Sequence, residues 1–140
     1  MIKKRDVLRI KMPFPNINSA LAMQSHMYIC REITGQSHSF LKCQTLKPYM
    51  LTGTIMRHYW DEQPDIARNP FQHTTRIDCD KLFITQGVIY ADQMRTPTRP
   101  DVCELTMTQI EQELVCDGFS SCGINEDDVV SLNYLATKAV

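Results

Sequence analysis

Hydrophobic and polar residues alternate along much of the first two thirds of the chain, which predicts short strands. The predicted strands are residues 6–12, 26–33, 39–46, 73–80 and 87–94. A turn is expected at Lys81–Phe83 between the last two strands. Residues 13–25 contain proline and asparagine and are expected to form a loop, with one helical turn at Ser19–Met23.

After two prolines near residue 100 the hydrophobic period changes to that of a helix. The apolar stripe expected on this helix consists of Leu105, Ile110, Leu114 and Val115. Thr106 or Thr108 is expected to cap its start, and Gly118 is expected to end it.

A final helix is predicted from Asn125 to Ala139. Asn125 is a favourable N-cap, and three acidic residues follow it at the positive end of the helix dipole. Its expected apolar face consists of Val129, Leu132, Leu135 and Ala136. Strands followed by helices predict a mainly β, α+β protein, a small antiparallel sheet or barrel with C-terminal helices.

Residues 47–72 are harder to assign. The segment LTGTIMRHYWDE is either a short helix or a strand, and the proline-rich QPDIARNP follows it. A cation and two aromatic rings lie close together here, and base stacking on such rings contributes about 1–3 kcal/mol per base. Arg57 and Trp60 are therefore candidate RNA contacts, although packing of this segment onto the rest of the fold explains them equally well.

The stretch from Met12 to Cys30 holds no Lys, Arg, Asp or Glu, and Lys11 and Arg31 bracket it. A buried strand accounts for the second half of the stretch. The first half is expected to be a loop, and its lack of charge still needs an explanation.

The formal net charge of −1 conceals an asymmetry. Residues 1–60 hold nine basic and two acidic residues, whereas residues 61–140 hold six basic and fourteen acidic residues. A basic N-terminal half is able to present a stripe to phosphates, but pairing between the two signs, or simple solvation, is an equally good interpretation.

The cysteine pattern and the N-terminus favour a cytoplasmic protein. Six cysteines lack paired C-x-x-C spacing, so we expect reduced thiols, several of them in core strands, and no metal or cofactor. The N-terminus has no apolar signal region, and no apolar run is long enough to span a membrane.

The order of these segments resembles the MazF/PemK family of toxins. KKRDVLRIKMPFP is similar to that family's opening strand, and HMYICRE occupies its second strand. FLKCQTLKP resembles the third strand. The most specific portion is DCDKLFITQGVIYADQMRTP, which contains a strand-and-turn motif that ends at Arg95. The helix around Thr108–Val115 follows, as it does in the family.

The resemblance covers residues 3–116, with an insertion at about 47–70, and leaves residues 117–140 as a C-terminal helical extension. We therefore expect a barrel domain at 1–116. The resemblance implies an SH3-like barrel, a homodimer, and a metal-independent endoribonuclease that cleaves single-stranded RNA and is covered by a cognate antitoxin.

Two residues carry most of the family's chemistry, an arginine in an arginine–proline pair before the second strand and a threonine at the end of the third. Thr45 stands at the threonine, but the arginine–proline pair falls on Ser25–His26. No arginine or lysine lies in the preceding loop. A histidine acts as acid or base near neutral pH, so the expected catalytic residues are Thr45, His26 and Ser25.

Lys47 and Arg95 join the expected RNA contacts: Lys47 follows the third strand, and Arg95 stands at the arginine of the last motif. Two functions remain open: a ribonuclease with a rebuilt site, or a catalytically degenerate barrel that binds RNA or protein. A gyrase-directed poison is a weaker third alternative.

Overall fold

The computed structural model describes residues 1–51 and 56–140, and within these ranges the chain is mainly β with three α-helices. The strands are β1 (Val7–Ile10), β2 (His26–Thr34), β3 (Ser37–Thr45), β4 (Tyr59–Glu62), β5 (Thr75–Asp78), β6 (Lys81–Gln86), β7 (Val88–Tyr90), β8 (Ser120–Gly123) and β9 (Ala136–Lys138). The helices are α1 (Ala20–Met23), α2 (Glu104–Asp117) and α3 (Glu126–Leu132), with 3-10 turns η1 (Pro48–Leu51) and η2 (Asp92–Met94). The predicted α+β class is confirmed.

Seven strands form one sheet, in the order β1–β2–β3–β5–β4, with β6 beside β3 and β8 parallel to β6. β3 pairs with β6 through residues 37–40 and with β5 through residues 43–45. Among the described strands β1 and β4 end the order without pairing with each other, so the sheet is open. β7 and β9 form a separate antiparallel pair.

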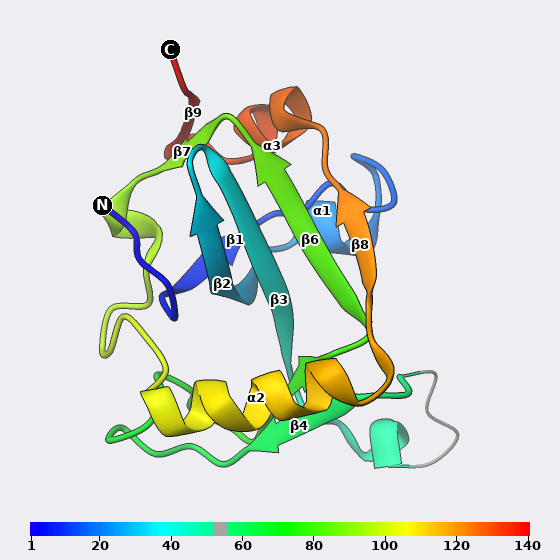
Figure 1. The fold of residues 1–140 in the computed structure, drawn as a ribbon. Helices are drawn as coiled ribbons and strands as arrows, with labels where there is room; N and C mark the ends of the chain where they lie inside the picture. The colour runs from blue at the N-terminus through cyan, green and yellow to red at the C-terminus, as the bar shows by residue number, and fades with distance from the viewer. Residues whose placement is uncertain (52–55) are drawn as a thin grey trace.

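Both faces of the large sheet are covered, because side chains alternate between two cores. Leu8 and Phe40 belong to the first core, which α3 and the β7–β9 pair complete. Val7 and Leu41, each one position away along its strand, belong to the second core, which α2 completes. In Figure 1, α2 runs across the lower end of the sheet near β4, and α3 with β7 and β9 lies at the upper end.

The uncharged stretch closes one end of the first core. Met12 is fully buried, its backbone N–H donates to the Leu21 carbonyl at 2.8 Å, and Leu21 packs against the core. The Phe14 ring meets the Phe83 ring edge-on at 5.2 Å. Ser19 caps the predicted helical turn by accepting from the Ala22 N–H. Among residues 12–25, a charge would be buried at Met12, Pro13 and Ala22, whereas residues 15–18 and 23–25 are exposed. Burial therefore accounts for the lack of charge only at the three buried positions.

The expected turn at Lys81–Phe83 is wrong, because these residues begin β6. The chain turns earlier, at Asp80, whose N–H donates to Asp78 Oδ1 at 2.8 Å. β6 continues because β8 pairs with its free side, and the Ser and Gly residues of β8 gave no strand pattern of their own. The predicted strand 87–94 ends at Tyr90 and continues as the η2 turn.

The start of α2 also differs from the prediction. Cys103 caps it by accepting from the Thr106 N–H, and neither threonine serves as the cap. Leu105 and Val115 lie on the solvent side, at 58% and 71% exposure, whereas Ile110 and Leu114 are fully buried as expected. Gly118 ends the helix with a positive φ of 79°, as predicted.

The final helix is shorter than predicted. Asn125 caps α3 and accepts from the Asp128 N–H at 3.0 Å, but the helix ends at Leu132. Leu135 lies in the following turn, and Ala136 begins β9. Residues 117–140 are therefore not only helical, because they supply β8 and β9 as well as α3.

The ambiguous segment at 51–62 becomes strand β4 at its end, whereas residues 52–55 lie outside the described residues. All six cysteines are free thiols, and Cys30, Cys43 and Cys79 are buried in or beside core strands, as predicted. Within the described ranges, no helix is both long enough and apolar enough to cross a bilayer.

Candidate nucleic-acid cleft

Three strands deliver side chains to one surface where the second core ends. In the β1–β2–β3 register, Arg9 lies opposite Met27, and Met27 lies opposite Cys43. Continuing this register places Ser25 opposite Thr45. Val7, on the same face of β1 as Arg9, is fully buried, whereas Arg9 is exposed. On this face of β1, the second core therefore ends between Val7 and Arg9, and the Arg9 side chain is exposed.

A cleft of about 330 Å³ occupies this place, and we call it the Arg9 cleft. It is lined by Arg9, Ser25, His26, Met27, Cys43, Gln44, Thr45, Lys47, Tyr49 and Met50. All three expected catalytic residues and one expected RNA contact, Lys47, thus lie around one cleft.

Arg9 is the residue that the sequence reasoning missed. Its guanidinium makes no hydrogen bond or ion pair with any described residue, and it lines the cleft beside Ser25–His26. The cleft therefore holds a cation from β1 that has no partner among the described residues. The sequence did contain a sign of this. Arg9 lies two positions after Val7, on the same face of the strand, and a charged residue on a face that is otherwise apolar indicates where the core ends.

The polar groups of the cleft are available for a ligand. The His26 Nδ1–H donates to the Gln24 carbonyl at 3.0 Å, because a carbonyl only accepts. That bond leaves Nε2 as the acceptor of the neutral ring. The hydroxyls of Thr45 and Ser25 have no partner among the described residues, and Lys47 is exposed. A base, two hydroxyls and two cations thus meet at one cleft.

Two further clefts share Arg9 with the first. The tail cleft, about 480 Å³, is lined by Arg9, Lys11, Ser25, Gln93, Met94, Arg95, Pro97, Leu132, Asn133, Tyr134 and Leu135. The His73 cleft, about 240 Å³, is lined by Arg9, Met27, Thr45, Pro70, Gln72, His73, Thr75, Thr96, Pro97 and Thr98. Among the described residues, no Asp or Glu lines any of the three clefts, although the chain has more acidic than basic residues.

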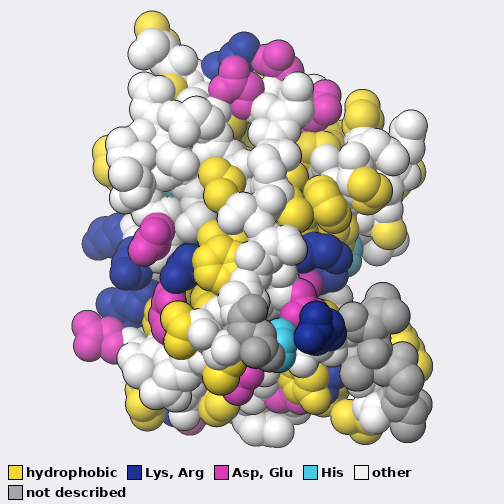
Figure 2. Space-filling view, turned by 45° about the vertical axis from the view of Figure 1, so that its right-hand side comes forward, with side chains coloured by type: hydrophobic (Ala, Val, Ile, Leu, Met, Phe, Trp, Pro, Cys, Tyr) yellow, Lys and Arg dark blue, Asp and Glu magenta, His cyan; other side chains and the backbone are white. Residues whose placement is uncertain are grey.

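The other expected RNA contacts are placed differently. Arg95 lines the tail cleft, but its guanidinium also lies 3.8 Å from Asp6 Oδ2. Arg57 lies in another depression, with Asp80 and Lys81 beside the start of β8. On the side of the molecule that Figure 2 brings forward, Lys and Arg side chains occur together with Asp and Glu. That mixture of charges contrasts with the lining of the Arg9 cleft.

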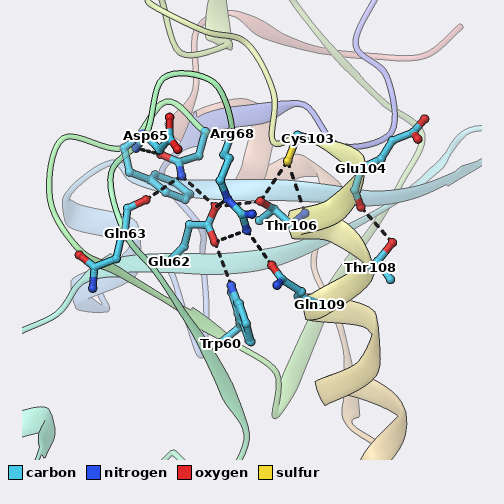
Figure 3. Close-up of polar contacts among 12 residues, drawn as sticks. Trp60, Glu62, Gln63, Asp65, Arg68, Cys103, Glu104, Thr106, Thr108 and Gln109 are labelled. Atoms are coloured by element: carbon cyan, nitrogen blue, oxygen red, sulfur yellow. Dashed lines mark hydrogen bonds and ion pairs between the residues drawn. The ribbon is translucent and has the colours of Figure 1, made fainter.

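Trp60 belongs to a buried polar network that holds residues 60–69 to α2 (Figure 3). Its indole N–H donates to Glu62 Oε1 at 3.0 Å. Glu62 is 2% exposed and also accepts hydrogen bonds from Arg68, Asn69 and Thr106. Burial alone would raise the pKa of the Glu62 carboxyl, but these donors hold it below its usual value. The placement of Trp60 fits the packing interpretation of this segment.

Comparison with family models, with curated proteins and with solved structures found no match for this chain.

Proposed function

We propose that the Arg9 cleft binds single-stranded RNA and cleaves it without a metal ion, through the 2′-hydroxyl, as the MazF/PemK resemblance implies. One observation carries this proposal. Three clefts that meet at Arg9 are lined by Arg9, Lys11, Lys47 and Arg95, and by no carboxylate among the described residues. Such a surface suits a polyanion, because each phosphate that it neutralises releases counterions.

The residues of the Arg9 cleft are able to activate the 2′-hydroxyl and to stabilise the charge that develops on the phosphate. Nε2 of His26 takes the proton of the 2′-hydroxyl, and the 2′ oxygen then attacks phosphorus. Arg9 and the Thr45 hydroxyl bind the non-bridging oxygens, where negative charge develops. The 5′ oxygen leaves and takes a proton from solvent, so the products carry a 2′,3′-cyclic phosphate and a 5′-hydroxyl.

The test is incubation of the protein with a long unstructured RNA in the presence of EDTA. Discrete cuts with cyclic-phosphate ends are expected from the parent. Arg9→Ala, His26→Ala and Thr45→Ala should each lower the single-turnover rate, Arg9→Ala by about 10²- to 10³-fold, as for loss of one charge-stabilising donor. Lys4→Ala is the matched control, because Lys4 is an exposed cation of the same segment that lines none of the clefts. Equal loss in Lys4→Ala and Arg9→Ala would contradict the proposal.

A second candidate is a barrel that binds RNA or protein without cutting. It is favoured by the Ser25–His26 pair, which stands where the family has arginine–proline. Bound but intact RNA, with binding lost in Arg9→Ala, would select it.

The finer family features belong to the same proposal. The open sheet is then a diverged form of the family's SH3-like barrel, and the chain is a homodimer with a cognate antitoxin. The expected size of the protein in solution is that of two chains. A mass of 16.2 kDa, that of one chain, would contradict the dimer.

A further inference from the structure

The tail cleft continues the Arg9 cleft past the end of β1. Arg9 and Ser25 line both, so a ligand seated on Arg9 lies next to both clefts. The tail cleft lies beside the segment after α3, which is outside the part of the chain that resembles the toxin family.

Tyr134 is the unusual residue of this cleft, because it is 90% exposed and yet lies between two anchored residues. On one side, the Asn133 side chain accepts from the Lys11 N–H at 2.9 Å and donates to the Lys11 carbonyl at 3.0 Å. On the other, Leu135 packs against the first core and its carbonyl accepts from the Ala91 N–H. The backbone on both sides of the exposed ring is thus fixed, which reduces the entropy lost when a ligand stacks on it.

The charged and apolar residues around Tyr134 indicate which class of ligand fits the tail cleft. Lys11 and Arg9 have side chains without partners among the described residues, and Arg95 adds a third cation. Met94, Leu132 and Leu135 supply an apolar floor, and no described carboxylate lines the cleft. Cations beside an exposed aromatic ring fit a nucleotide, whose phosphate needs the former and whose base stacks on the latter. An acidic peptide would use the cations but has no general need of the ring.

We propose that the tail cleft binds the nucleotide next to the phosphate held by Arg9, with its base stacked on Tyr134. This inference rests on the proposed function, and it makes the substrate an extended single strand. In a duplex the base would be stacked on its neighbours and unavailable to the ring.

The test measures fluorescence anisotropy with a labelled 2′-O-methyl hexa-adenylate, which resists cleavage because its 2′ oxygen is blocked. Tyr134→Ala should weaken binding about 5- to 100-fold, the usual effect of losing one stacked base. Tyr134→Phe keeps the ring and should bind like the parent, whereas Tyr134→Leu should bind like Tyr134→Ala. An exposed side chain contributes little to folding, so equal melting temperatures are expected for all three variants.

Oligonucleotides with one abasic position make the test sharper. At one position, removal of the base should weaken binding to the parent and leave binding to Tyr134→Ala unchanged. If Tyr134→Ala binds all probes like the parent while Arg9→Ala has lost affinity, the tail-cleft inference is overturned and the proposed function stands. If the parent binds none of the probes, the proposed function itself is overturned. Loss of affinity in Tyr134→Phe as large as that in Tyr134→Ala would overturn stacking as the cause.

Discussion

Asn133 joins the C-terminal segment to the first strand by holding both backbone groups of Lys11. Its Oδ1 accepts from the Lys11 N–H and its Nδ2 donates to the Lys11 carbonyl, across 122 positions of sequence. Just after the end of β1, the Asn133 side chain therefore makes the two backbone hydrogen bonds that a neighbouring strand would otherwise make. Residues 117–140 are thus part of the same packed unit, since they also bring fully buried Val129 into the first core.

Asn133→Ala should lower the free energy of unfolding by about 2–3 kcal/mol. Asn133 is 8% exposed, and the substitution leaves half-buried Lys11 backbone groups and the Val129 carbonyl without its side-chain bonds. Urea denaturation at neutral pH measures the change. Asn18→Ala, an exposed asparagine, should remain within about 0.5 kcal/mol of the parent. An equally small change in Asn133→Ala would show that water replaces these bonds.

Glu62→Gln should destabilise the protein by about 3 kcal/mol, because the buried carboxylate is the common acceptor of the network in Figure 3. The amide offers one acceptor oxygen and places an N–H among donors. Urea denaturation measures the loss, with the exposed Glu32→Gln as the control. Trp60 fluorescence should also change in Glu62→Gln, since its indole loses a charged partner. An unchanged spectrum and midpoint would contradict the role given to Glu62 in holding residues 60–69 to α2.

The first three strands were predictable because their side chains alternate between two cores. The predicted bounds of β2 at 26–33 differ from the structure by one residue at one end. The helix ends at Asn125 and Gly118 were predictable because a cap depends on one local residue, and the helical turn at Ser19–Met23 was also predicted. β8 was not, because its pairing comes entirely from the free side of β6.

The candidate site was predictable only in part. Ser25, His26, Thr45 and Lys47 were selected through the family resemblance, and they line one cleft. Arg9 was missed because the missing arginine was sought in the loop before β2, whereas the cross-strand register brings a cation from β1. Glu62 was missed because its partner in α2 lies 44 residues away in sequence.

His38 should make stability depend on pH near neutrality. Its ring lies against Phe40 and Tyr90, and this burial lowers the pKa of the imidazole below its ordinary 6.5. The unfolded chain therefore binds the proton more readily, so stability is full above about pH 6.5 and falls as the pH decreases below it. Urea midpoints at pH 7.5 and 5.5 should differ less in His38→Phe than in the parent. The exposed His73→Gln should retain the parent's difference. Equal differences in parent and His38→Phe would contradict this assignment.

The salt dependence of RNA binding tests whether Arg9 contacts a phosphate. For single strands, the slope of log K against log salt is about −0.7 for each phosphate neutralised. Arg9→Ala should therefore reduce the magnitude of the slope by about 0.7 as well as weaken binding, because its guanidinium has no other described partner.

The probe is again the uncleavable hexa-adenylate, titrated between low and physiological salt. Lys4→Ala should keep the parent's slope. Arg57→Ala decides whether the depression beside β8 also contacts RNA, since only a phosphate contact there would reduce its slope. Weaker binding of Arg9→Ala at an unchanged slope would mean that Arg9 shapes the cleft without touching the backbone of the strand.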